Sequence, residues 1–160
     1  MKWILCAVTF LTLLPGARGH AQINGPTPTL MGEPSYHIYS VPFAITGGNR
    51  PFFLCTNTTD AAIRVGVEGF AAVGGAAIND PSATSLSVPA SGTRLFGSPA
   101  VGLSVDSSVG IGIVSKGSAR ILATKSKGII CTAFLADVGN DPPTSMLQLN
   151  IVAKTKQKGD

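Results

Sequence analysis

The sequence predicts an all-β protein folded as a two-sheet β-sandwich, and three observations support that prediction. Short apolar runs are rich in Val, Ile, Thr and Ser, and 19 glycines and 11 prolines provide frequent turns between them. No segment shows the apolar spacing of an amphipathic helix, and no internal repeat is visible. Removal of a leader leaves about 140 residues, enough for one domain with a single buried core.

The first 21 residues have the organisation of a secretory signal peptide. Lys2 supplies a positive charge, a mainly apolar region of twelve residues follows at 3–14, and a Pro-Gly pair ends the run. This run is too short to cross a bilayer, which needs about 20 apolar residues. Cleavage is expected after Gly19 or after Ala21, and the second is favoured because alanine next to the cut is commoner. We expect a protein that is secreted, periplasmic or held at the extracellular surface, with no transmembrane segment after cleavage.

Three regions follow the leader. Residues 22–40 are rich in Pro, Gly and Thr, which predicts an extended N-terminal arm with little regular structure. Residues 41–154 contain most of the strand-like runs and form the predicted sandwich domain. Residues 155–160 are polar and basic, which predicts a flexible tail.

The apolar runs predict about nine strands. The ten candidate runs fall at 36–45, 52–57 and 62–70, twice within 84–96, four times within 101–136, and at 146–154. Pro42 favours an edge position for the first strand, because proline cannot donate a ladder hydrogen bond. A turn from Pro89 to Gly92 separates the two strands of 84–96, and Gly92 is expected to accept a positive φ.

The strand at 62–70 alternates with a period of two. One set of its side chains is apolar: Ile63, Val65 and Val67. The other set is Arg64, Gly66 and Glu68. We therefore expect one face of this strand to be buried and the other to be wet.

Positive charge is modest but unevenly distributed. The leader takes Lys2 and Arg18 with it, which leaves ten Lys and Arg against eight Asp and Glu, a net charge of +2. That charge is too small to indicate a nucleic-acid partner. Seven cations gather in the last third of the chain: Lys116, Arg120, Lys125, Lys127, Lys154, Lys156 and Lys158. They predict either solvated edge strands protected from aggregation or a patch that binds an anionic surface.

Two cysteines remain once the leader is removed. Cys55 and Cys131 each lie in an apolar, strand-like run. Because an exported chain meets an oxidising environment, they predict one inter-strand disulfide. The alternative is a pair of reactive thiols, but no C-x-x-C motif or neighbouring cation supports it.

A cysteine in an early strand that faces one in a late strand resembles the immunoglobulin-type sandwich. The resemblance covers the general layout of residues 41–153 and implies an immunoglobulin-like two-sheet fold. Two features of the family are missing, because Trp3 leaves with the leader and no tyrosine-corner motif lies near Cys131. A likeness at this level implies a fold and no function.

Two histidines offer a metal site that depends on the cleavage position. If His20 begins the mature chain, its amine and imidazole together with the His37 ring make a three-nitrogen set of the kind that copper prefers. In this feature the chain is similar to secreted histidine-brace proteins, among them lytic polysaccharide monooxygenases and periplasmic copper carriers. The alternative is that His20 leaves with the leader and His37 is an ordinary edge-strand residue, in which case no cofactor is expected.

Hydrolytic chemistry finds less support. The G-x-S-x-G motif is absent, and a Ser-His-Asp arrangement would have to use His37. Candidates for paired carboxylates are Glu68, Asp60, Asp80, Asp106, Asp137 and Asp141. Most of these lie in turn contexts, where Asp is favoured for local backbone hydrogen bonds.

Asn57-Thr58-Thr59 matches the acceptor motif for N-glycosylation. A tight turn explains the same residues, because Asn and Thr side chains hydrogen-bond to the backbone of turns. The motif leaves both alternatives open.

Together these observations predict an exported, non-catalytic β-sandwich. We expect it to act as a structural, adhesive or protein-binding component of a cell surface or secreted assembly, through exposed strand edges. A homo-oligomer is one form that such pairing would take. The alternative function is copper binding by His20 and His37.

Overall fold

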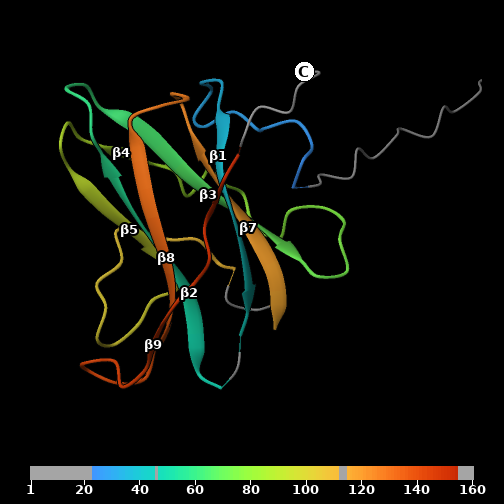
Figure 1. Cartoon of the computed structure of the whole chain (residues 1–160), viewed down its shortest axis with the longest axis vertical. Helices are drawn as coiled ribbons and strands as arrows, with labels where there is room; N and C mark the ends of the chain where they lie inside the picture. Colours follow the sequence, from blue (N-terminus) through green and yellow to red (C-terminus); the bar gives the residue numbers. More distant parts are fainter. Residues whose placement is uncertain (1–22, 46, 112–114, 155–160) are drawn as a thin grey trace, which may run out of the picture.

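The computed structural model describes residues 23–45, 47–111 and 115–154. In that part of the chain all regular structure is β-strand, arranged as two five-stranded sheets that form a sandwich (Figure 1). The predicted all-β, two-sheet fold is therefore confirmed. The predicted signal peptide and the predicted tail lie outside the described residues and stay predictions.

Sheet one has the strand order β10-β1-β7-β3-β4, with all neighbours antiparallel. Its strands are β1 (Tyr36–Ala44), β3 (Ile63–Ala71), β4 (Leu86–Val88), β7 (Lys116–Ala123) and β10 (Val152–Ala153). Pro42 of β1 lies opposite Ser118 of β7, whereas β10 reaches only Tyr39 and Ser40. Pro42 therefore has no described strand on its other side, which is the edge environment that a proline in a strand requires.

Sheet two has the order β6-β5-β2-β8-β9. Its strands are β2 (Asn49–Asn57), β5 (Thr93–Gly97), β6 (Ser107–Ser108), β8 (Ile129–Asp137) and β9 (Met146–Gln148). Only β5 and β6 are parallel. Successive strands commonly change sheet, since β2 and β3 lie in different sheets and so do β4 and β5. The short links at residues 58–62 and 89–92 are therefore connections between the two layers.

The core lies between the two sheets and is made of the inward side chains of both. Ile63, Val65 and Val67 are buried there, as their alternation predicts. From sheet two, Phe53 and Phe96 lie opposite each other on β2 and β5 and enter the same core. Burial of such side chains is the main favourable contribution to the stability of the fold.

Three predicted strands differ in the structure. Residues 101–105 form a loop, and 109–111 form no strand, while 112–114 lie outside the described residues. The run at 146–154 divides into β9 in sheet two and β10 in sheet one. Leu149 and Ile151, between these two strands, pack against the core. The segment therefore crosses the open side of the sandwich and closes it.

The prediction of a wet outer face on β3 is wrong. Gly66 is buried, and Glu68 is only 4% exposed. The carboxylate of Glu68 accepts a hydrogen bond from Nε of Arg120 on β7, whose side chain is completely buried. The Arg120 guanidinium also lies 5.4 Å from the centre of the Phe70 ring. A buried charge must be paired and hydrogen-bonded, and this pair meets both conditions.

The cover over this face comes from the residues that precede β1. Arg120 donates to the backbone carbonyls of Gly25 and Pro26, each at 2.9 Å, and of Ile23 at 3.3 Å. Leu30 is completely buried, and a Cβ added to Gly66 would come within 2.8 Å of its Cδ2. A strand-period pattern reports on one strand only, so it could not reveal a cover that comes from elsewhere in the chain.

The covering segment, residues 23–35, contains no strand but has internal hydrogen bonds. Thr27 Oγ1 donates to the Ser35 carbonyl at 2.6 Å, and Ser35 Oγ donates to the Pro28 carbonyl. Leu30 and Glu33 exchange backbone hydrogen bonds. We call residues 23–35 the docked arm. Residues 36–40 of the arm predicted for 22–40 belong to β1, which begins at Tyr36, and residue 22 lies outside the described residues.

Cys55 and Cys131 form the predicted disulfide. They lie directly opposite each other on β2 and β8, with a Cα–Cα distance of 4.2 Å. The bond therefore joins neighbouring strands of one sheet, whereas the disulfide of immunoglobulin domains joins the two sheets. The structure establishes a two-sheet sandwich with an inter-strand disulfide and does not establish the immunoglobulin type.

The turn between β4 and β5 is present, but its positive φ lies one residue earlier than predicted. Ser91, and not Gly92, has a φ of +55°. A Cβ on Gly92 would collide with the side chain of Pro89. Glycine is therefore required here for close packing within the turn.

Candidate binding surfaces

The C-terminal edge, which we define as residues 146–153, is the most exposed apolar stretch on a strand edge in the described chain. Met146 and Leu147 on β9 are 60% and 63% exposed, and Val152 on β10 is 50% exposed. These eight residues contain no charge and no proline. β9 is the last strand of sheet two, so no described strand pairs with its outer side. Figure 1 shows this segment running from β9 toward the end of the chain marked C.

The strand beside this edge is only partly covered. β9 pairs with residues 134–136 of β8, and Leu149 N then donates to the Ala133 carbonyl at 2.8 Å. After that point the chain leaves for sheet one, where β10 pairs with β1. Ile130, near the start of β8, is 58% exposed. Exposed apolar side chains are therefore found on the outer strands β9 and β10, and on β8, which neighbours β9.

A tyrosine pocket of about 620 Å³ lies where β1, β8 and β10 meet. Its lining comprises Tyr36, His37, Ile38, Tyr39, Ser126, Lys127, Gly128, Ile129, Ala153 and Lys154. Tyr39 belongs to sheet one, and its hydroxyl donates to the Ile129 carbonyl of sheet two at 3.0 Å. Backbone pairing places Lys154 beside β1, since Lys154 N donates to the Ile38 carbonyl at 2.9 Å. The pocket therefore has walls from both sheets.

His37 is half-buried in this lining and is held by local contacts. Its Nε2 lies 3.0 Å from the Tyr39 carbonyl oxygen and 3.0 Å from Ser40 Oγ. Because a carbonyl only accepts, Nε2 carries the proton and Nδ1 keeps a lone pair, which is buried without a hydrogen-bond partner. Desolvation, together with the positive charges of Lys154 and Arg120, lowers the pKa of His37 from 6.5 to about 4. The ring is therefore neutral at physiological pH.

The predicted copper ligands cannot be compared directly. His20 lies outside the described residues, so its distance from His37 is not defined. Within the described part of the chain, no group of three or more His, Cys, Asp and Glu side chains could hold a metal ion. Copper binding by His20 and His37 stays a prediction. A metal at His37 would have to use a ring whose Nε2 is hydrogen-bonded and whose Nδ1 is buried.

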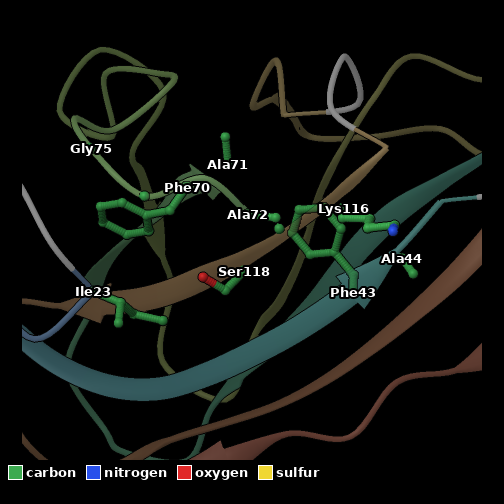
Figure 2. A pocket seen from close by; sticks show the side chains of 11 residues that line it. Ile23, Phe43, Ala44, Phe70, Ala71, Ala72, Gly75, Lys116 and Ser118 are labelled. Carbon is green, nitrogen blue, oxygen red and sulfur yellow. The ribbon is translucent and has the colours of Figure 1, made fainter.

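An open apolar hollow of about 460 Å³ lies at the other end of β1. Figure 2 shows the rings of Phe43 and Phe70 on either side of Ser118, with Ile23 of the docked arm beside them. Among the described residues that line the hollow, only Lys116 and Ser118 have polar side chains. This arrangement provides apolar contact but no acid–base pair.

The seven cations of the last third do not form one patch. Arg120 is completely buried beneath the docked arm, so the prediction that it contributes to an exposed patch is wrong. Lys116 lines the apolar hollow, whereas Lys127 and Lys154 line the tyrosine pocket. Lys156 and Lys158 lie outside the described residues. Two of the seven predicted cations, Lys127 and Lys154, line the same pocket.

The candidate carboxylates mostly maintain structure. Asp137 accepts hydrogen bonds from the backbone or side chains of Asn140, Thr144 and Ser145, and so organises the loop after β8. Desolvation opposes ionisation, but these hydrogen bonds outweigh it and lower the pKa of Asp137 to about 2. Asp80 likewise accepts from backbone N–H groups of its own loop. Asp106 pairs with Arg94 at 2.9 Å.

Asn57 forms part of a buried turn. Its Nδ2 donates to the carbonyls of Ala61, Val88 and Pro89 at 2.7–3.1 Å. Its Oδ1 accepts from the backbone N and the Oγ1 of Thr59. The side chain is fully buried, so the turn explanation of Asn57-Thr58-Thr59 holds for the folded protein.

Sequence reasoning missed the tyrosine pocket. Tyr36 and Tyr39 are the only tyrosines of the chain, and both line it. Their spacing on one strand was visible, but Lys127 and Lys154 reach the same pocket from distant parts of the chain. The pairing of β10 with β1 brings in Lys154, whereas Lys127 comes from the link between β7 and β8.

Comparisons with known proteins add no relative. Protein-family models, curated protein sequences and solved structures all gave no match to this chain. Within the described residues, no helix is long and apolar enough to span a membrane. The proposals below therefore rest on the geometry of the described surfaces.

Proposed function

We propose that this protein is an exported, non-catalytic structural component that pairs with a second copy of itself along the C-terminal edge. Such pairing would let it serve as a building unit of a cell-surface or secreted assembly. The observation that carries the proposal is the unpaired, uncharged edge at residues 146–153, with Met146 and Leu147 exposed on β9.

A second copy suits this edge for physical reasons. An outer strand presents unpaired N–H and C=O groups, which another strand can satisfy. Proteins that avoid such pairing place lysine or proline on the edge, and residues 146–153 contain neither. Two copies of one edge can meet around a two-fold axis, so that each apolar side chain meets its equivalent. Two copies with a predicted mature net charge of only +2 repel each other weakly.

A non-catalytic role is supported by the work that the reactive side chains already do. Glu68 neutralises buried Arg120, Asp137 organises a loop, and Asp106 pairs with Arg94. Each of these carboxylates is thus committed to maintaining the fold.

Export is supported by the disulfide. Cys55 and Cys131 are oxidised across two central strands, and such bonds persist in compartments outside the reducing cytoplasm. The predicted leader at residues 1–21 agrees with that environment.

Sedimentation velocity over a range of protein concentrations tests the assembly. We expect the wild-type protein to form a dimer as concentration rises, and the Met146→Lys/Leu147→Lys variant to remain monomeric at the same concentrations. The matched control is Val73→Lys/Val101→Lys, which changes two exposed apolar side chains outside the edge, 95% and 70% exposed. A wild-type protein that is monomeric at every soluble concentration, or an edge variant that dimerises equally well, would refute the proposal.

A further inference from the structure

The tyrosine pocket combines positive charge with ring surface, and Ala153 is the one residue of its described lining that also belongs to the C-terminal edge. Lys127 and Lys154 belong to its described lining, which contains no acidic residue, and Lys127 also lines the neighbouring hollow that contains Asp60. The ion pairs of the described residues all use arginines, so neither lysine is neutralised by an acid there. The pocket therefore has an uncompensated positive charge in the described structure.

The aromatic part of the lining is held in place. Tyr39 is anchored by its hydrogen bond to the Ile129 carbonyl of the opposite sheet. Tyr36 lies at the start of β1 and is 51% exposed, which leaves its ring open to contact. Tyrosine offers a large flat apolar surface at low entropic cost and commonly contacts ring-bearing ligands.

The rest of the lining limits the charge that a ligand can carry. Ile38, Ile129 and Ala153 contribute apolar surface. Because burial of a strongly hydrated anion is costly, such surface favours a singly charged acid over a doubly charged phosphate. A lysine ammonium binds such an acid as a point charge. The volume of about 620 Å³ lies within the range of small-molecule sites.

We propose that the tyrosine pocket binds a small carboxylate that carries a ring, with Lys127 and Lys154 attracting the acid group and Tyr36 contacting the ring. An aromatic acid and a sugar acid share this chemistry. The experiment below separates these two sources.

The chain provides a selective reporter of this binding. Tyr36 and Tyr39 are its only tyrosines, so protein labelled with ¹³C in the tyrosine rings gives signals from this pocket alone. The probes are benzoate for an aromatic acid and glucuronate for a sugar acid. Benzyl alcohol and glucose keep the ring without the charge, and acetate keeps the charge without the ring.

We expect at least one ring acid to shift the tyrosine signals saturably, with a Kd of about 1 mM or tighter. Binding of benzoate alone assigns an aromatic acid, and binding of glucuronate alone assigns a sugar acid. The Lys127→Ala/Lys154→Ala variant should bind about tenfold more weakly or not at all. Lys125→Ala is the matched control, because Lys125 lies on the same turn but lines a neighbouring hollow without entering this pocket.

Several results would overturn the proposal. These are no shift with either acid, equal binding of the neutral analogues or of acetate, unchanged affinity in the double lysine variant, or an equal loss in Lys125→Ala. The Met146→Lys/Leu147→Lys variant should bind the acid like the wild type, since neither residue lines the pocket. Failure of the proposed assembly therefore remains distinguishable from failure of this site.

Discussion

The two ends of the described chain lie against the same sandwich in opposite ways. The docked arm at residues 23–35 has its carbonyls hydrogen-bonded by Arg120 and its Leu30 completely buried. The C-terminal edge at residues 146–153 forms one outer strand of each sheet yet leaves Met146 and Leu147 mostly exposed. One end completes the fold, and the other leaves strand surface available.

The difference shows that regular secondary structure does not measure how firmly a segment is held. The docked arm contains no strand, but a buried ion pair, an apolar side chain and internal hydrogen bonds fix it. The C-terminal edge contains two strands, each paired on one side only. The docked arm is held firmly because its apolar side chain is buried and its polar groups are satisfied. The C-terminal edge is held less firmly because one side of each of its strands has unpaired backbone groups.

The largest expected effect comes from breaking the contacts that hold the docked arm. Arg120→Met leaves Glu68 buried without its partner, and loss of one member of a buried pair costs about 3–5 kcal/mol. Urea denaturation should show this decrease in the free energy of unfolding. Thermolysin should also cut the arm faster, because three of its carbonyls lose their donor.

A double variant separates the charge effect from the arm effect. Arg120→Met/Glu68→Met removes both charges, so most of the lost stability should return, while the arm stays more sensitive to thermolysin. A loss below about 1 kcal/mol in Arg120→Met would show that the arm is held by other contacts.

The next effect in size is the pH dependence of stability that His37 causes. Charges near both ends of the described chain influence the pKa of this residue. Its pKa is about 4 in the folded protein because of burial and the charges of Lys154, on the C-terminal side, and Arg120, beneath the arm. Between pH 4 and 6.5 the unfolded chain binds more protons at this residue. Stability should therefore be complete above pH 6.5 and decrease as the pH falls toward 4.

The measurement is the free energy of unfolding at several pH values for the wild type and His37→Gln. The variant should lose the part of the slope that lies in this window, while any contribution from His20 is common to both proteins. Identical slopes would mean that His37 has the same pKa in the folded and unfolded states.

The smallest expected effect on stability comes from the other end. Met146→Lys/Leu147→Lys should unfold within about 0.5 kcal/mol of the wild type when both are monomeric, because exposed side chains contribute little. Thermal or urea denaturation at low protein concentration measures it. A loss comparable to that of Arg120→Met would mean that β9 is part of the core and that the two ends do not differ as described.

Several features of the fold could be predicted because they depend on local patterns. The alternation of Ile63, Val65 and Val67 identified the inner face of β3, and Cys55 and Cys131 identified the disulfide. The division of 146–154 between two sheets could not be predicted, because a continuous stretch of mostly apolar residues with no turn signal suits one strand as well as two. The placement of the disulfide within one sheet was also open, because a cysteine in a strand-like run does not show which strand will lie beside it.

The sequence by itself determined that the described chain is all-β with two pairing cysteines, and that its start is rich in proline and glycine; the leader stays a prediction. Composition and period-two alternation carry that information, since they act within a single segment. Only the tertiary structure decided that Glu68 and Arg120 are buried, that residues 23–35 cover them, and that Lys127 and Lys154 share a pocket with the two tyrosines. These facts depend on contacts between residues far apart in the chain, and no local pattern records which distant segment will supply the partner.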